Sequence, residues 1–163
     1  MADTDTDPSI AVTGRVFSTT MLVRFRHCDP AGIVFYPRYF EMINDLVEEW
    51  FDQGLGLSFE ALHAGRGIGT PLASVQCNFF APSRWNETLT QTLIVRRIGG
   101  ASFTAEVQFF GADGDSRLNA ALTIVTVDLN RMKSIAMPDD LRQRMQEFLL
   151  LQDGDNHENS TTP

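Results

Sequence analysis

The feature that most constrains the fold of this chain is one long amphipathic helix followed by a nearly continuous series of strand-like segments. Between residues 37 and 53, apolar side chains recur at steps of three and four, which places them on one helical face. Acidic residues fill much of the remaining surface, and Gly54 suits a left-handed helix end. We therefore expect a helix over 37–53 that buries one face, made of Tyr39, Met42, Ile43, Leu46, Val47 and Trp50.

The rest of the pattern is mostly strand. Segments rich in Val, Ile, Thr and Phe occupy 69–82, 86–98, 101–111 and 116–129, and short turn sequences separate them. A first strand is expected over 18–27, and a last helix over 138–151. Because short links join successive strands only as antiparallel neighbours, the order predicts an α+β fold, one antiparallel sheet around one long helix. Open sheet edges are commonly covered by another subunit, so we expect at least a dimer.

Composition narrows the class of protein. A chain of 163 residues fits one domain, which we place at 15–151, and the polar stretches 1–14 and 152–163 are expected to be disordered. The net charge of −8 argues against nucleic-acid binding, and no apolar run is long enough to span a membrane. Two cysteines provide neither a disulfide framework nor a metal-binding pair. These features favour a cytoplasmic protein without a bound metal.

A loop with one carboxylate precedes the long helix. Asp29 is followed by Pro30, whose ring fixes its φ angle, and by Gly32, which can adopt φ angles closed to other residues. Pro37 suits the first turn of a helix. The start of a helix exposes unpaired N–H groups that can bind an oxygen atom as it becomes negative. A carboxylate next to such a site can act as a catalytic group. The alternative is that Asp29 only caps the helix, and the spacing leaves both interpretations open.

The stretch 23–40, and most specifically Asp-Pro-Ala-Gly-Ile-Val-Phe-Tyr-Pro at 29–37, resembles the hotdog-fold acyl-CoA thioesterases of the 4-hydroxybenzoyl-CoA thioesterase family. The resemblance extends more loosely to about Pro138. It implies a homodimer or homotetramer with the hotdog fold, an acyl-CoA substrate and no further cofactor. It also implies that Asp29 is either the nucleophile or the general base, and that the backbone N–H of Tyr36 holds the thioester carbonyl oxygen.

The same resemblance suggests substrate contacts. Where the 4-hydroxybenzoyl enzyme has an acidic side chain on its long helix, this chain has Asn44, which leaves the acyl group open between aromatic and short- or medium-chain aliphatic thioesters. A non-catalytic module that binds acyl-CoA is the alternative from another class. The expected ligands of the coenzyme A phosphates are Arg96, Arg97, Arg131 and Lys133, with Arg38 and Arg84 as weaker candidates.

Several nearby residues are given other roles. We expect His27 beside Asp29, His63 in a loop, and Cys28 as a structural thiol, because no obvious base accompanies it. Phe35 and Tyr39 are expected to pack in the core. The chain has no Gly-x-Ser-x-Gly motif and no phosphate-binding loop, so neither an α/β-hydrolase nor a nucleotide triphosphatase is supported.

Overall fold

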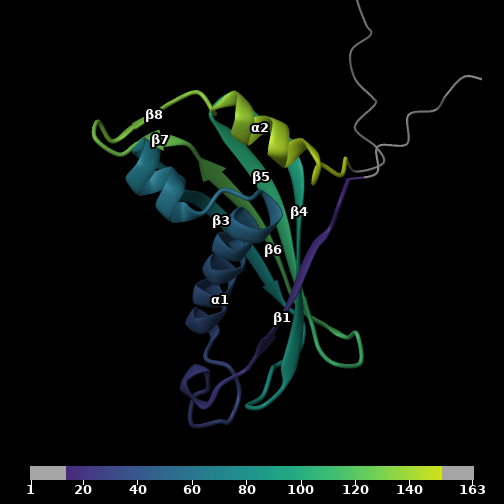
Figure 1. The fold of residues 1–163 in the computed structure, drawn as a ribbon. Coiled ribbons are helices and arrows are strands. Elements are labelled where there is room, and N and C mark those ends of the chain that lie inside the picture. Colours follow the sequence, from purple (N-terminus) through teal and green to yellow (C-terminus); the bar gives the residue numbers. More distant parts are fainter. Residues whose placement is uncertain (1–13, 152–163) are drawn as a thin grey trace, which may run out of the picture.

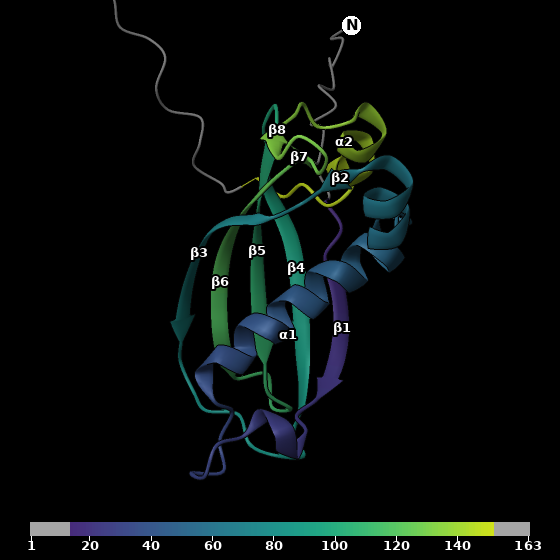
Figure 2. The same cartoon turned by 90° about the vertical axis from the view of Figure 1, so that its left-hand side faces the viewer.

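The fold is one long helix packed across one face of an antiparallel sheet (Figure 1). The structure is a computed structural model and describes residues 14–151. The helix is α1 (Tyr36–Glu49), and Figure 2 shows it crossing the sheet at an angle. The sheet has the strand order β1-β4-β5-β6-β3. Its strands are β1 (Phe17–Leu22), β3 (Leu72–Phe79), β4 (Thr88–Ile98), β5 (Ser102–Phe110) and β6 (Ser116–Val125).

A second, three-stranded sheet closes one end of the molecule, and a short helix packs nearby (Figure 1). The small sheet contains β2 (Ile68–Gly69), β7 (Val127–Asp128) and β8 (Lys133–Ser134), and the helix is α2 (Asp139–Gln146). Three short helical segments complete the described chain: the 3-10 turn η1 (Phe25–His27) and the π-helical segments η2 (Trp50–Gly54) and η3 (Ala61–Gly65).

The core lies between α1 and the sheet. On β4, β5 and β6, buried and partly exposed residues alternate, as expected for strands with one covered face. The six apolar residues predicted for the helical face are all buried, with Trp50 fully enclosed at the start of η2. Each large apolar side chain buried in this way stabilises the fold by about 1.5–3 kcal/mol. The expected helix therefore forms, and its apolar face makes the core.

Local differences from the predicted elements have backbone causes. The first strand ends at Leu22 instead of residue 27, because the chain turns into η1 and the ring of His27 binds the N–H of Arg24. The segment 69–82 is divided at Pro71, which cannot donate a ladder hydrogen bond. The segment 116–129 is divided at Thr126, whose N–H and hydroxyl bind carbonyls outside the sheet. The last helix ends at Gln146 instead of residue 151.

The connection between β3 and β4 is a crossing and not a hairpin. β3 pairs with β6, whereas β4 pairs with β1 and β5. Eight residues separate β3 from β4, and they span up to about 27 Å when extended, enough to cross two intervening strands. This crossing leaves β3 at an edge of the sheet, where nearly all of its residues are exposed.

Candidate active site

The loop that carries Asp29 is a tight, well-bonded turn. Asp29 is its first residue and Gly32 its fourth, and the N–H of Gly32 donates to the Asp29 carbonyl over 2.9 Å. Pro30 at the second position and Asp at the first are typical of a type I turn. Gly32 follows with φ of +75°, a conformation that glycine adopts without strain. The turn is closed by the N–H of Asp29, which donates to the Ile33 carbonyl over 3.0 Å.

The carboxylate of Asp29 does not cap α1. Its Oδ1 accepts a hydrogen bond of 2.8 Å from the N–H of Ala31, inside its own turn. The residue that precedes α1 is Phe35, which offers no side-chain cap. The capping alternative is therefore excluded. One carboxylate oxygen of Asp29 fixes the turn, and the other, Oδ2, has no hydrogen-bond partner among residues 14–151.

The start of α1 leaves one backbone donor available. The N–H of Phe35 donates to the His27 carbonyl and that of Arg38 to the Phe35 carbonyl, while Pro37 has no N–H. Within the described chain, the N–H of Tyr36 has no acceptor. It lies at the positive end of a 14-residue helix, where an oxygen that becomes negative is stabilised. The donor expected from the sequence is thus unoccupied.

Tyr39 and Ser83 fix the loop and the helix relative to each other. The hydroxyl of Tyr39 donates to Ser83 Oγ over 2.9 Å and accepts the Ser83 N–H over 3.2 Å. The Ser83 carbonyl in turn accepts the N–H of Val34, next to the Asp29 turn. Burial raises the pKa of Tyr39, so the hydroxyl stays protonated. Tyr39 is buried as predicted, whereas Phe35 is 47% exposed and that prediction was wrong. The role of Ser83 was not predicted.

His27 and Cys28 do not take part as catalytic groups in this geometry. The Nδ1 of His27 accepts the N–H of Arg24, and no hydrogen bond joins its ring to Asp29. Burial and the neighbouring cations Arg26 and Arg38 lower the pKa of His27, so the ring is neutral at pH 7. Burial, together with the charge of Asp29, raises the pKa of the Cys28 thiol. A thiol that stays protonated is a poor nucleophile, which agrees with a structural role.

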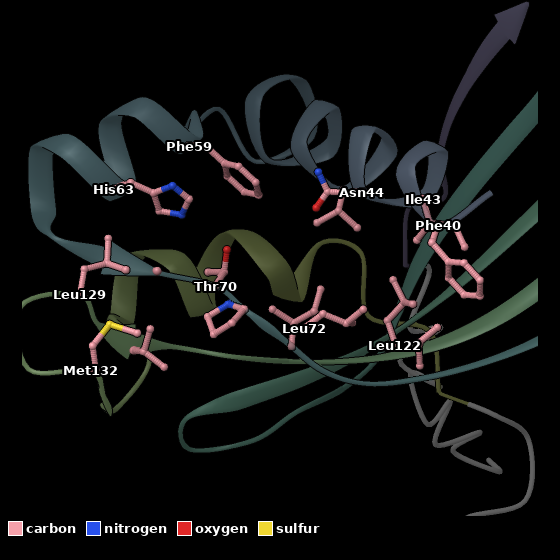
Figure 3. Close-up of a pocket in the computed structure, with 16 residues that line it drawn as sticks. Phe40, Ile43, Asn44, Phe59, His63, Thr70, Leu72, Leu122, Leu129 and Met132 are labelled. Carbon is pink, nitrogen blue, oxygen red and sulfur yellow. The ribbon is translucent and has the colours of Figure 1, made fainter. Parts of the chain in front are cut away.

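A cavity of about 350 Å³ extends along α1 on the side of β3 (Figure 3). Asn44, the residue singled out on the helix, lines it. Tyr36, Phe40 and Asn44 follow one another at four-residue steps, so one helical stripe leads from the free amide of Tyr36 into the cavity. Most of the lining is apolar, including Phe40, Val47, Phe59, Leu72, Leu122 and Leu129.

His63 also lines this cavity, on η3, where a loop was expected. The signal in the sequence was a short apolar pattern around Phe59 and Leu62, which is too brief to predict a helix against the surrounding glycines. The ring of His63 packs against Phe59, with 4.8 Å between the ring centres.

The predicted phosphate ligands lie away from the Asp29 turn of the same chain. Arg97 is nine residues along β4 from Thr88, which pairs with Leu22 near the turn, a span of about 30 Å. The turn that holds Arg131 joins β7 and β8 at the opposite end of α1 (Figure 2). Arg96 is bound to Glu106 over 2.8 Å, whereas Arg97 and Lys133 form no ion pair with a described carboxylate.

Three exposed arginines lie closer to the Asp29 turn. Arg24 and Arg26 precede it in the chain, and Arg84 pairs with Ile33 within it. None of the three forms an ion pair with a carboxylate among residues 14–151. Arg84 was expected as a weaker candidate, and the position of all three arginines at the turn makes them further candidates for binding an anion.

A family model for the thioesterase-like superfamily matches residues 23–145, which include the Asp29 turn, α1 and every strand after β1. The chain belongs to the thioesterase-like superfamily. The predicted resemblance is confirmed, and so is the α+β hotdog fold. Within residues 14–151, no group of three His, Cys, Asp or Glu side chains is placed to hold a metal ion, and no helix is long and apolar enough to cross a bilayer.

Individual members of the superfamily differ in acyl group. The chain is 22% identical over 132 residues to the long-chain acyl-CoA thioesterase FadM of Escherichia coli K12, covering 80% of this chain and 98% of that protein. It is 26% identical over 125 residues to the 4-hydroxybenzoyl-CoA thioesterase of Pseudomonas sp. CBS-3, covering 72% and 89%. The crystal structure of a 1,4-dihydroxy-2-naphthoyl-CoA thioesterase from Synechocystis superposes with a TM-score of 0.74 at 19% identity, covering 88% and 100%.

Proposed function

We propose that this protein hydrolyses acyl-CoA thioesters to a free acid and coenzyme A. The observation that carries the proposal is the arrangement of the Asp29 turn and the start of α1 in a chain of the thioesterase-like superfamily. Among residues 14–151, neither the second carboxylate oxygen of Asp29 nor the N–H of Tyr36 has a hydrogen-bond partner. A carboxylate and an oxyanion donor are the two groups that thioester hydrolysis requires.

Two routes use these groups. In the first, the free oxygen of Asp29 attacks the thioester carbonyl, the C–S bond breaks to release coenzyme A thiolate, and water hydrolyses the mixed anhydride that remains. In the second, Asp29 accepts a proton from a water molecule as that water attacks the carbonyl, and the C–S bond then breaks to release the free acid and coenzyme A thiolate. In both, the carbonyl oxygen becomes negative and the N–H of Tyr36 stabilises it. A thiolate leaves easily, so neither route needs a strong general acid.

The cavity along α1 supports an aliphatic acyl group as a second candidate besides an aromatic one. From the amide of Tyr36, the helical stripe continues for 11 residues to Val47, which corresponds to about 16 Å. This distance exceeds the length of a single aromatic ring, and the lining is apolar over most of it. An extended hydrocarbon chain would bury more apolar surface there than a benzoyl group. Asn44 lies partway along, as a polar contact within the path.

The active form is proposed to be a homodimer, or a homotetramer built from such dimers. The exposed edge strand β3 carries Leu72, Val75 and Phe79, each at least 36% exposed, and offers an unpaired row of backbone groups. Antiparallel pairing of two copies of β3 would cover these side chains. It would also bring Arg97 and Lys133 of one chain toward the other chain. There they are proposed to bind the phosphates of the coenzyme A held by that second chain.

Release of free thiol by the purified protein tests this function. The substrate panel contains aromatic acyl-CoAs and saturated acyl-CoAs of increasing length, each at the same concentration. We expect turnover of at least one class, with the aliphatic series rising in kcat/KM as the chain grows long enough to fill the cavity. Binding of acyl-CoA without turnover across the whole panel would instead support a non-catalytic binding module.

A further inference from the structure

Two polar atoms at one end of the cavity have no partner within the described chain. The Nε2 of His63 and the Oγ1 of Thr70 are both buried and lack any hydrogen bond. Both residues line the cavity along α1, and Figure 3 shows the imidazole and the hydroxyl gathered at the same end, beside Phe59. A buried polar atom without a partner is costly and rare in folded proteins, so two around one space need an explanation.

The other unpaired atoms in the described chain are unlike these two. The Nε of Arg117 lies 2.8 Å from the carboxylate of Asp115, so its charge is matched. The Nε1 of Trp50 is enclosed in the core, where the ring packs among Phe51, Phe103 and Phe148. Only the His63 and Thr70 atoms, among these residues, belong to side chains that line the cavity along α1.

His63 and Thr70 form a polar end of the cavity, and a ligand group that binds them must reach that end. Phe40 is one helical turn from Tyr36 and lies at one end of the cavity in Figure 3, while His63 and Thr70 lie at the other, with Asn44 between. Asn44 is already eight residues, or about 12 Å, along the helix from Tyr36. A group that reaches His63 is therefore remote from a carbonyl held at Tyr36.

The chemistry of the polar end selects the kind of group. Imidazole and hydroxyl can each donate or accept one hydrogen bond here, and a hydroxyl on the ligand can do both at once. A carboxylate would place a negative charge in an apolar cavity that no Lys or Arg of the described chain lines, which is strongly unfavourable. A plain methyl end would leave both protein atoms unpaired.

We propose that the acyl group bound at this site is a long aliphatic chain with a hydroxyl at or near its far end, and that His63 and Thr70 bind that hydroxyl. The inference rests on the proposed thioesterase function, because it takes the carbonyl to be held at Tyr36. It assigns the two residues as specificity determinants, and it gives the products as an ω-hydroxy fatty acid and coenzyme A.

The test compares a saturated long-chain acyl-CoA with its ω-hydroxy derivative, and the two free acids in parallel by titration calorimetry. The wild-type protein should favour the hydroxylated member by about tenfold, both in kcat/KM and in affinity for the free acid. Thr70→Val replaces the hydroxyl with a methyl group and should abolish the preference, so that the two thioesters give equal kcat/KM and the two free acids bind equally well. Thr123→Val is the matched control, because Thr123 neighbours Leu122 on β6 but points to the opposite face.

The outcomes separate the two proposals. Turnover of both thioesters with no preference for the hydroxyl, or a preference that persists in Thr70→Val, overturns this inference and leaves the thioesterase function standing. A preference among the free acids, lost in Thr70→Val, supports the inference even when neither thioester is hydrolysed, in which case the proposed function fails. Absence of binding by either acid, with activity confined to aromatic thioesters, also overturns the inference.

Discussion

At the scale of single residues, the two oxygens of Asp29 have different surroundings. Oδ1 accepts the N–H of Ala31 and holds the turn, while Oδ2 is left without a partner in the described chain. The sequence was enough to single out Asp29 as a candidate catalytic residue. It could not show which oxygen holds the turn and which is left without a partner, because that depends on the backbone conformation of the turn. The same limit applied to His63, whose place on the cavity depends on how η3 packs against β2.

His27 gives a prediction about pH at this scale. Burial and nearby arginines lower the pKa of His27 in the folded protein below 6.5, the ordinary value that it has in the unfolded chain. At a pH between the folded and the unfolded pKa, the unfolded chain therefore binds more protons than the folded protein. Lowering the pH through 6.5 should therefore reduce the free energy of unfolding. Protonation at Nδ1 would also break its hydrogen bond with Arg24.

Denaturant unfolding of the wild-type protein and His27→Asn between about pH 5 and pH 8 measures this effect. We expect the stability of the wild type to fall more steeply toward low pH than that of the variant. Parallel curves for the two proteins would show that His27 does not titrate between the folded and unfolded states.

At the scale of elements, the link between Tyr39 on α1 and Ser83 before β4 determines where the Asp29 turn lies. Tyr39→Phe should lower the free energy of unfolding by about 1–3 kcal/mol, because it leaves the buried Ser83 N–H and hydroxyl unpaired. It should also lower kcat more than it changes KM, since the turn loses its anchor to the helix.

Tyr36→Phe is the control, since it removes the same hydroxyl from a side chain that is 61% exposed and keeps the backbone donor. Chemical denaturation and steady-state kinetics compare the free energy of unfolding and the kcat of the two variants. Equal stability and kcat in Tyr39→Phe and Tyr36→Phe would contradict the positioning role of Tyr39.

The elements themselves could be predicted to different degrees. The long helix was clear from the sequence because its apolar residues recur with the helical period over four turns. The pairing of β3 with β6 was not, because the eight-residue link before β4 allows either a turn back or a crossing. A sequence shows which residues prefer a strand, whereas the choice of partner depends on distant packing.

At the scale of the whole molecule, the exposed edge of β3 is the surface through which we expect two chains to associate. We expect sedimentation equilibrium to give at least twice the chain mass of 18.2 kDa. Gln76→Lys should shift the protein toward single chains, because two copies paired through β3 would place like charges near each other at the middle of the strand. Gln143→Lys on α2 makes the same change of charge away from the sheet edge and should leave the mass unchanged.

A wild-type protein that sediments as a single chain at all concentrations would contradict pairing through β3. It would also remove the proposed way in which Arg97 and Lys133 of one chain could reach a coenzyme A bound at the Asp29 turn of another. The exposed arginines at the turn itself would then be the remaining candidates.

If the second carboxylate oxygen of Asp29 performs the chemistry, Asp29→Asn must lose it, and thiol release by this variant measures that loss. The Asn carbonyl can still accept the N–H of Ala31, so the turn and the thermal unfolding temperature should be preserved. We expect kcat to fall by about a thousandfold while acyl-CoA still binds. A folded Asp29→Asn protein that retains more than about a tenth of the wild-type kcat would contradict it.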